Sequence, residues 1–367
     1  MAKHNGANAR IKHEYFAYLK EAQRRDEASI DAVAKALSRF EEVNGHKDFK
    51  NFHRAQAVAF KRKLDETVAV RTGKPLSRAT VYSTLSALRA FFVWLAGQPG
   101  YKSKLRYSDA DYFNLPEKDA RVAKATRIKP FATLDQIHHV LSAMPTGSDI
   151  ELRNRALIAF AILTGARDGA LASFKLKHVD LAEGRVDQDA REVQTKASKT
   201  FSTWFFPVGG EALAIVEHWC GYLRTELLWG DDDPLFPATK IGLGTAGGFQ
   251  PVGLRRDGWA SAGPIRDIFR HAFEAAGLPY FNPHSFRNTL VQLGQRLCTT
   301  PEEYKAWSQN LGHEQVLTTF TSYGNLVPHR QGEVMRGLGD EKPDMTADAA
   351  LIAQVVDVIR KMPDRRG

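Results

Sequence analysis

Apolar residues recur at helical spacing through most of this 367-residue chain. One such stripe, within residues 29–44, consists of Ile30, Val33, Leu37, Phe40 and Val43. Side chains that return every three or four residues lie on one face of a helix. Further helices are expected over 11–24 and 52–67, and a fourth runs from the N-cap residue Ser77 to Gly97. The chain therefore opens with a small helical bundle.

One stretch departs from helical spacing. Residues 191–195 (REVQT) and 200–206 (TFSTWFF) are rich in β-branched and aromatic residues, and the polar KASK lies between them. This pattern predicts two strands joined by a tight turn, the only β-hairpin expected in the chain. The glycine-dense residues 242–263 are expected to form a long surface loop.

Residues 242–247 match the dinucleotide-binding pattern G-x-G-x-x-G. No clear strand precedes them and no helix follows, so the structural context of that site is missing. We therefore interpret the glycines as loop residues.

Residues 116–130 (PEKDARVAKATRIKP) lack apolar periodicity and carry a proline at each end, which is typical of a linker between domains. Thr133 and Gln136 then have the spacing of a capping box at the start of a new domain. Five more helices are predicted, over residues 152–163, 211–229, 264–276, 284–297 and 301–309. The expected fold is mainly α with a small β-sheet.

This organisation gives four parts. A first helical domain spans residues 1–115, a basic linker 116–130, and a second domain 131–340. A helical tail covers 341–367, where Leu351, Val355 and Ile359 belong to one apolar stripe. Such a tail either folds back on its own domain or docks on a neighbouring subunit.

The positive charge of the chain lies in its first third. Residues 1–130 contain 26 Lys and Arg and 14 Asp and Glu, a net charge of +12, whereas the whole chain carries +9. Clustered cations bind polyanions through neutralised phosphates and released counterions. The candidate DNA-contacting residues are Lys61, Arg62, Lys63, Arg71, Lys74 and Arg78, with Arg255 and Arg256 in the second domain.

Other classes of protein are disfavoured by composition. The longest apolar run, residues 156–163, is far shorter than the ~20 residues that a membrane span needs, and the polar N-terminal sequence resembles no signal peptide. Cys220 and Cys298 are far apart, which favours two buried thiols. No metal-binding motif is present, so a cytoplasmic protein without a metal or another cofactor is expected.

Five short motifs follow one another in the second half of the chain. They are Thr164-Gly-Ala-Arg167, a lysine between the predicted strands, His284-Ser-Phe-Arg287, Leu311-Gly312-His313 and Tyr323. Each is weak alone, but the ordered set resembles the tyrosine recombinase (phage integrase) family. The resemblance covers about residues 131–330, and the basic helical module in front is similar to the core-binding domain of that family.

The resemblance implies a role for each residue. Tyr323 would be the nucleophile, Arg167 and Arg287 would hold the scissile phosphate, and His284 and His313 would bind it and assist proton transfer. Lys196 would be the general acid, with Lys199 as the alternative. Two sequence features depart from the family pattern. Many members carry an acidic residue three positions after the first arginine, where this chain has Ala170, with Asp168 acidic instead. Tyr323 also follows His313 by one residue more than usual. Tyr304, the other tyrosine nearby, is expected to pack on a helix.

These residue types suit metal-independent transesterification. A phenol with an ordinary pKa of about 10 can both form a phosphoester and be displaced from it. Guanidinium groups stay charged and bind phosphate oxygens in bidentate fashion, so they can stabilise the transition state. A histidine can accept the phenolic proton or orient the phosphate, and a lysine can protonate the leaving 5′-hydroxyl.

The implied function is site-specific DNA recombination through a 3′-phosphotyrosine intermediate. The implied partner is double-stranded DNA with inverted-repeat sites, which a homotetramer would bind. An accessory directionality factor is a further candidate partner. Two alternatives stay open. The chain could relax DNA as a type IB topoisomerase does, or it could bind DNA without catalysis.

Overall fold

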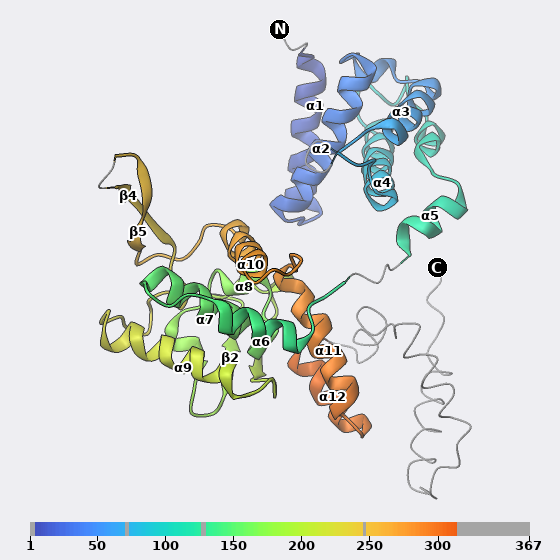
Figure 1. The fold of residues 1–367 in the computed structure, drawn as a ribbon. Coiled ribbons are helices and arrows are strands. Elements are labelled where there is room, and N and C mark those ends of the chain that lie inside the picture. The colour runs from blue at the N-terminus through green and yellow to red at the C-terminus, as the bar shows by residue number, and fades with distance from the viewer. Residues whose placement is uncertain (1–3, 70–72, 126–129, 245–246, 314–367) are drawn as a thin grey trace, which may run out of the picture. The chain divides into compact units, whose positions relative to one another are not determined.

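The computed structural model describes residues 4–69, 73–125, 130–244 and 247–313. The chain divides into two compact units, Met1–Arg127 and Ile128–Gly367, which are described separately below. Helices dominate both units, and the second also contains two small antiparallel sheets (Figure 1). The predicted fold class, mainly α with a small β component, is therefore confirmed.

The first unit is built around four longer helices: α1 (Gly6–Ala17), α2 (Glu27–Asn44), α3 (Arg54–Glu66) and α4 (Arg78–Ala96). A π-helical turn, η1 (Tyr18–Ala22), and two 3-10 turns, η2 (Phe49–Asn51) and η3 (Tyr107–Phe113), complete it. Aromatic rings fill its core, where Phe40 packs edge-on against Phe60 and Phe92. The predicted N-cap is also confirmed, because the Ser77 hydroxyl accepts a hydrogen bond from the Thr80 amide.

The segment expected to be a linker contains a further helix, α5 (Glu117–Lys124), which contacts α4. None of its residues is buried, so apolar periodicity could not reveal it. Acidic residues in its first turn and basic residues in its last turn favour the helix dipole. Lys124 also lies 5.2 Å from the centre of the Tyr82 ring on α4. Residues 117–124 of the predicted linker are therefore helical, and the division between the two units falls after Arg127, within 116–130.

The second unit is organised around α7 (Asp149–Thr164), whose residues 156–164 are all buried. Helices α6 (Leu134–Ala143), α9 (Gly210–Thr225) and α11 (Phe286–Leu297) contact α7. Helix α10 (Gly263–Ala275) contacts α6, and α12 (Pro301–Asn310) contacts α11 (Figure 1). A helix buried on all sides explains why its sequence is an uninterrupted apolar run.

The three-stranded sheet differs from the prediction. Its order is β1 (Val179–Asp180), β2 (Arg185–Gln188) and β3 (Phe201–Trp204). The strand expected at 191–195 is absent, because β3 pairs with β2, whose Val186 and Gln188 are buried. Residues 189–200 instead form turns, including the 3-10 turn η5 (Lys196–Ser198). The β-propensity of residues 191–195 (REVQT) was therefore outweighed by the burial of side chains on β2.

A second hairpin, β4 (Thr239–Leu243) and β5 (Phe249–Leu254), replaces part of the predicted glycine-rich loop. It is the long arm that extends from the second unit in Figure 1. Its strands carry exposed Leu243 and Phe249, whose apolar character did not suggest a strand because glycines surround them. Gly242 and Leu243 of the G-x-G-x-x-G pattern lie in β4, and β5 begins two residues after Gly247. A strand and not a helix therefore follows the pattern, consistent with the rejection of a dinucleotide site.

Candidate active site

The turn after α7 places Arg167. Gly165 ends the helix in the left-handed conformation (φ 59°), and a Cβ atom there would lie 2.9 Å from Leu290 Cδ1 on α11. Only glycine fits both the backbone angle and this close approach. Arg167 then becomes the N-cap residue of the short helix α8 (Asp168–Leu171). The predicted helix end at Thr164-Gly165 is thus confirmed.

Arg287 joins three of the predicted motifs through one guanidinium group. It lies on the first turn of α11 and is only 3% exposed. Its Nη1 donates to the Gly165 carbonyl at 2.7 Å, and its Nη2 donates to the Leu311 carbonyl at 2.5 Å and to His313 Nε2 at 2.9 Å. A buried charge without hydrogen-bond partners is strongly unfavourable, so these three contacts hold the guanidinium group of Arg287 in place.

His313 lies in a strongly cationic environment. It is 7% exposed, and burial together with the positive charges of Arg287 and Arg167 lowers its pKa to about 3. Lys199 and His284, the latter in the 3-10 turn η6 (Pro283–Ser285), lower the pKa further. Because a guanidinium can only donate, His313 Nε2 is the acceptor and its ring hydrogen resides on Nδ1. The ring is therefore a neutral hydrogen-bonding group.

The two candidate lysines line different pockets of the second unit. Lys196 lines a narrow pocket together with Arg167 and Arg287. Lys199 lines a larger, mainly apolar groove together with His313, bordered by β3 and α12. Lys196 is therefore close to the two arginines and Lys199 to His313, so both lysines are candidates for the general acid.

Two groups of site residues were missed by the sequence analysis. Asn310, at the end of α12, binds β3 through its side chain: Oδ1 accepts from the Trp204 amide at 2.7 Å and Nδ2 donates to the Trp204 carbonyl at 2.8 Å. Gln188 and Thr203 pair across β2 and β3 at 3.0 Å and line the pocket of Lys196. The position of Asn310, directly before Leu311-Gly312-His313, was the available signal.

Asp168, the acidic residue directly after Arg167, binds an arginine on another helix. Asp168 accepts from Arg266 Nε at 2.8 Å on α10, so its carboxylate is directed to that arginine. Ala170 is buried.

The Tyr304 hydroxyl donates to the Gln295 carbonyl at 3.4 Å, and the tyrosine lies on α12 as predicted. Tyr323 lies outside the described residues.

Most predicted DNA-contacting cations lie near the junction of α3 and α4. Arg78 at the start of α4 pairs with Asp65 of α3 at 2.8 Å, which brings the two basic clusters together. Lys61 Nζ donates to the Asn114 carbonyl, and Lys63 pairs with Glu66. Arg62 lies beside them on α3, and Lys74 lies in the turn before α4. Arg71 is outside the described residues.

The two basic residues of the second unit follow β5 and form ion pairs within the protein. Arg255 pairs with Asp257 at 2.8 Å. Arg256 binds both oxygens of Asp233, at 2.8 and 2.7 Å, and this contact lowers the pKa of that carboxyl. These pairs can stabilise the base of the hairpin even without DNA.

Both cysteines are buried, as predicted, and burial raises the pKa of Cys220 to about 12. Helix α4 is long and apolar enough to cross a membrane by length and composition, but its apolar residues belong to the core of the first unit. Within the described ranges, no group of three His, Cys, Asp or Glu residues could hold a metal ion.

Comparisons with known proteins match both units. A model of the phage integrase family matches residues 130–329, and one of the phage integrase N-terminal SAM-like domain matches residues 13–98. Tyrosine recombinase XerC of Escherichia coli O139:H28 is 31% identical over 198 residues, covering 52% of this chain and 59% of that protein. XerC of E. coli O157:H7 is 30% identical over 210 residues, covering 57% and 60%. The chain thus spans about 60% of these relatives.

Solved structures share the fold. The XerH site-specific recombinase bound to palindromic difH substrate, a post-cleavage complex, has a TM-score of 0.61 at 16% identity, covering 90% of this chain and 85% of that one. A lambda integrase(75-356) dimer bound to a COC′ core site has a TM-score of 0.58 at 15% identity, covering 92% and 99%. By the match of the catalytic-domain model and the motifs described above, this chain belongs to the phage integrase family.

Proposed function

We propose that the chain is a site-specific DNA recombinase that cleaves and rejoins DNA through a 3′-phosphotyrosine intermediate. The observation that carries this proposal is the position of Arg287, whose guanidinium contacts Gly165, Leu311 and His313. Those contacts join segments up to 122 residues apart into one cationic site, which includes Arg167 and both candidate lysines.

Arg167 and Arg287 hold the scissile phosphate and offset its charge in the transition state. His313 adds a hydrogen bond from Nδ1–H, because Nε2 is engaged with Arg287. Its low pKa makes it a poor proton acceptor, so proton transfer from the nucleophile falls to His284. The residues supply positive charge at the phosphate, and no metal or other cofactor is assigned to the reaction.

Tyr323 attacks the phosphorus, the bond from phosphorus to the 5′-oxygen breaks, and Lys196 protonates that oxygen. The free 5′-hydroxyl of a partner strand then attacks the phosphotyrosine and releases Tyr323. The energy of the broken phosphodiester is retained in the covalent intermediate, so the exchange needs no nucleotide hydrolysis. Lys199 is the alternative general acid, because it lies close enough to His313 to lower its pKa.

DNA with inverted-repeat sites is the proposed partner. The basic clusters of α3 and α4 contact phosphates of the duplex, with 116–130 and the second unit completing the contact surface. Four protomers on two duplexes form the active complex, in line with a related lambda integrase structure that is a tetramer bound to a Holliday junction. The reaction takes place in the cytoplasm, where an accessory directionality factor could act.

The test is a suicide substrate: a nicked half-site of the chain's own recombination site, which traps the covalent adduct. We expect an adduct with the wild-type protein, none with Tyr323→Phe, and a normal yield with the matched control Tyr304→Phe. Excess EDTA should leave the yield unchanged. No adduct on any half-site would favour a DNA-binding protein without catalysis.

The same adduct is expected for the topoisomerase alternative, so a second substrate separates the two enzymes. Supercoiled DNA with one site is relaxed by a topoisomerase but not recombined. Strand exchange between two sites supports the recombinase. Relaxation without exchange would contradict it.

A further inference from the structure

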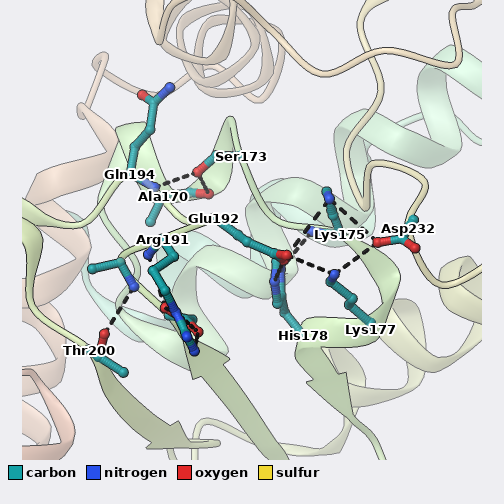
Figure 2. A network of polar contacts seen from close by, with 12 residues as sticks. Ala170, Ser173, Lys175, Lys177, His178, Arg191, Glu192, Gln194, Thr200 and Asp232 are labelled. Atoms are coloured by element: carbon teal, nitrogen blue, oxygen red, sulfur yellow. Dashed lines mark hydrogen bonds and ion pairs between the residues drawn. The ribbon is translucent and has the colours of Figure 1, made fainter.

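The turn segment between β2 and β3, residues 189–200, carries both candidate lysines. Figure 2 shows the polar contacts of Glu192 and Gln194 in this segment. The β2–β3 pairing ends with Gln188 and Phe201, so the position of the segment depends on its contacts with the rest of the second unit. Of its residues before Lys196, only Val193 is buried. Glu192 and Gln194 make polar contacts with other elements of the second unit.

Glu192 is bound by three basic residues from the turn before β1. Its Oε1 accepts from Lys177 Nζ at 2.9 Å, and its Oε2 lies 3.0 Å from His178 Nε2 and 4.0 Å from Lys175 Nζ. Asp232 binds both lysines from the opposite side, Lys177 at 2.8 Å and Lys175 at 3.5 Å (Figure 2). The hydrogen bonds from Lys177 and His178 lower the pKa of the Glu192 carboxyl.

His178 makes this attachment rigid. Its side chain is 6% exposed, and its Nδ1 accepts a hydrogen bond from the Lys175 backbone amide at 2.9 Å. Because that amide can only donate, the ring hydrogen resides on Nε2, where it is donated to Glu192. Exposed lysine–carboxylate pairs stabilise little by themselves, whereas a buried and oriented ring fixes the position of its partner.

Ser173 provides the second attachment. Its hydroxyl accepts from the Gln194 amide at 2.8 Å and donates toward the carbonyls of Gly169 and Ala170 at 3.1 and 3.2 Å. Those two carbonyls belong to α8, the helix that Arg167 begins. A Cβ atom on Gly169 would lie 3.4 Å from the Gln194 carbonyl, so the two segments are closely packed.

We propose that Glu192 and Ser173 are positioning residues, which hold the lysine-bearing segment against the turn of Arg167. This inference rests on the proposed function, because it assigns a role to the place where Lys196 or Lys199 supplies its proton. Both contacts lie only a few residues before Lys196: Glu192 precedes it by four residues, and Gln194, the partner of Ser173, by two. Loss of these contacts moves the lysine ammonium group away from the leaving oxygen.

The test compares two substrates that differ in one atom. In a half-site with a bridging 5′-sulfur, the leaving group is a thiolate, and a thiol with an ordinary pKa of about 8.5 leaves without a proton donor. Lys196→Ala should cleave the oxygen substrate about 10²–10⁴-fold more slowly and recover on the sulfur substrate. Lys199→Ala is measured beside it.

Glu192→Gln and Ser173→Ala should slow cleavage of the oxygen substrate about 10–100-fold, as expected for a displacement on the order of 1 Å, and should also recover on sulfur. Half-site affinity should stay unchanged. The matched controls are Glu211→Gln and Ser142→Ala, which remove a Glu–Ser hydrogen bond (3.0 Å) elsewhere in the same unit. Glu211 is 35% exposed and Glu192 36%, so the two carboxylates are comparably buried, and the controls should behave as wild type.

Two failures can be told apart. The first outcome is that the sulfur substrate restores cleavage by Lys196→Ala or Lys199→Ala, while Glu192→Gln and Ser173→Ala slow the cleavage of both substrates equally or of neither. In that case the positioning role is wrong and the proposed function stands. If sulfur rescues neither lysine variant, the general acid is wrongly assigned and the inference falls with it.

A measurement without DNA checks the same idea. Trypsin cleaves after Arg191, Lys196 and Lys199, all within the segment. Glu192→Gln and Ser173→Ala should be cut there several-fold faster than wild type, since local opening sets the rate. Cleavage at the wild-type rate in both variants would overturn the proposal.

Discussion

Single residues in this site are constrained by their backbone and by their charge environment. Gly312 adopts φ 69°, and a Cβ atom there would lie 2.6 Å from the Phe201 ring. The glycine therefore lets the chain turn against β3 and bring His313 to Arg287. A larger residue at this position would move the histidine out of the site.

The lowered pKa of His313 predicts a dependence of stability on pH. Between its usual pKa of about 6.5 and its folded value of about 3, the unfolded chain binds a proton at this residue and the folded chain does not. The free energy of unfolding must therefore fall as the pH is lowered through that window, by up to about 1.4 kcal/mol per pH unit.

His313→Gln keeps an acceptor for Arg287 but cannot titrate. Urea unfolding at pH 6, 5 and 4 should give a shallower loss of stability for the variant than for the wild type, by on the order of 1 kcal/mol per pH unit. Carboxylates with lowered pKa values, such as Asp233, contribute equally to both proteins and cancel in the difference. Parallel pH profiles would show that His313 does not titrate in this way.

At the scale of elements, α7 is joined to the β4–β5 hairpin by one buried cation. Arg153 is 1% exposed, and burial lowers its pKa to about 10. Its guanidinium donates to the Pro237 carbonyl and to Thr239 Oγ1 just at the start of β4, and lies 4.8 Å from the centre of the Trp259 ring that follows β5. A single side chain thus contacts both ends of the hairpin.

Arg153→Ala should lower the free energy of unfolding by about 2–4 kcal/mol, because it leaves buried acceptors without a donor and opens a cavity. The measurement is urea unfolding of the full chain followed by tryptophan fluorescence. Arg255→Ala, which removes an exposed ion pair with Asp257, is the control and should change stability by no more than about 1 kcal/mol. Equal effects of the two variants would contradict the role of Arg153.

At the scale of the whole molecule, we propose that the charge asymmetry and the C-terminal tail determine how copies meet on DNA. Residues 1–130 carry the net positive charge, so we expect binding to a half-site to depend on that part of the chain. The apolar stripe of 341–367, which is outside the described residues, is proposed to dock on a neighbouring protomer.

Deletion of residues 341–367 should therefore leave half-site binding intact and weaken assembly of the four-protomer complex. Gel-shift titrations with one-site and two-site DNA measure the two steps separately. Val355→Asp should reproduce the defect, since it places a charge in the apolar stripe, whereas Asp357→Ala on the polar side should not. Normal assembly by the truncated protein would exclude docking between protomers.

The sequence by itself determined the helices with strong apolar stripes, their caps at Ser77 and Gly165, and the ordered motifs of the catalytic domain, because these depend on neighbours a few residues apart. Tertiary structure decided that 185–188 and not 191–195 forms the strand, since burial and pairing outweigh local propensity. It also decided the contacts of Arg287, the low pKa of His313 and the anchoring of the lysine-bearing segment by Glu192. Each of these depends on groups far apart in the chain, whose distances only the folded structure sets.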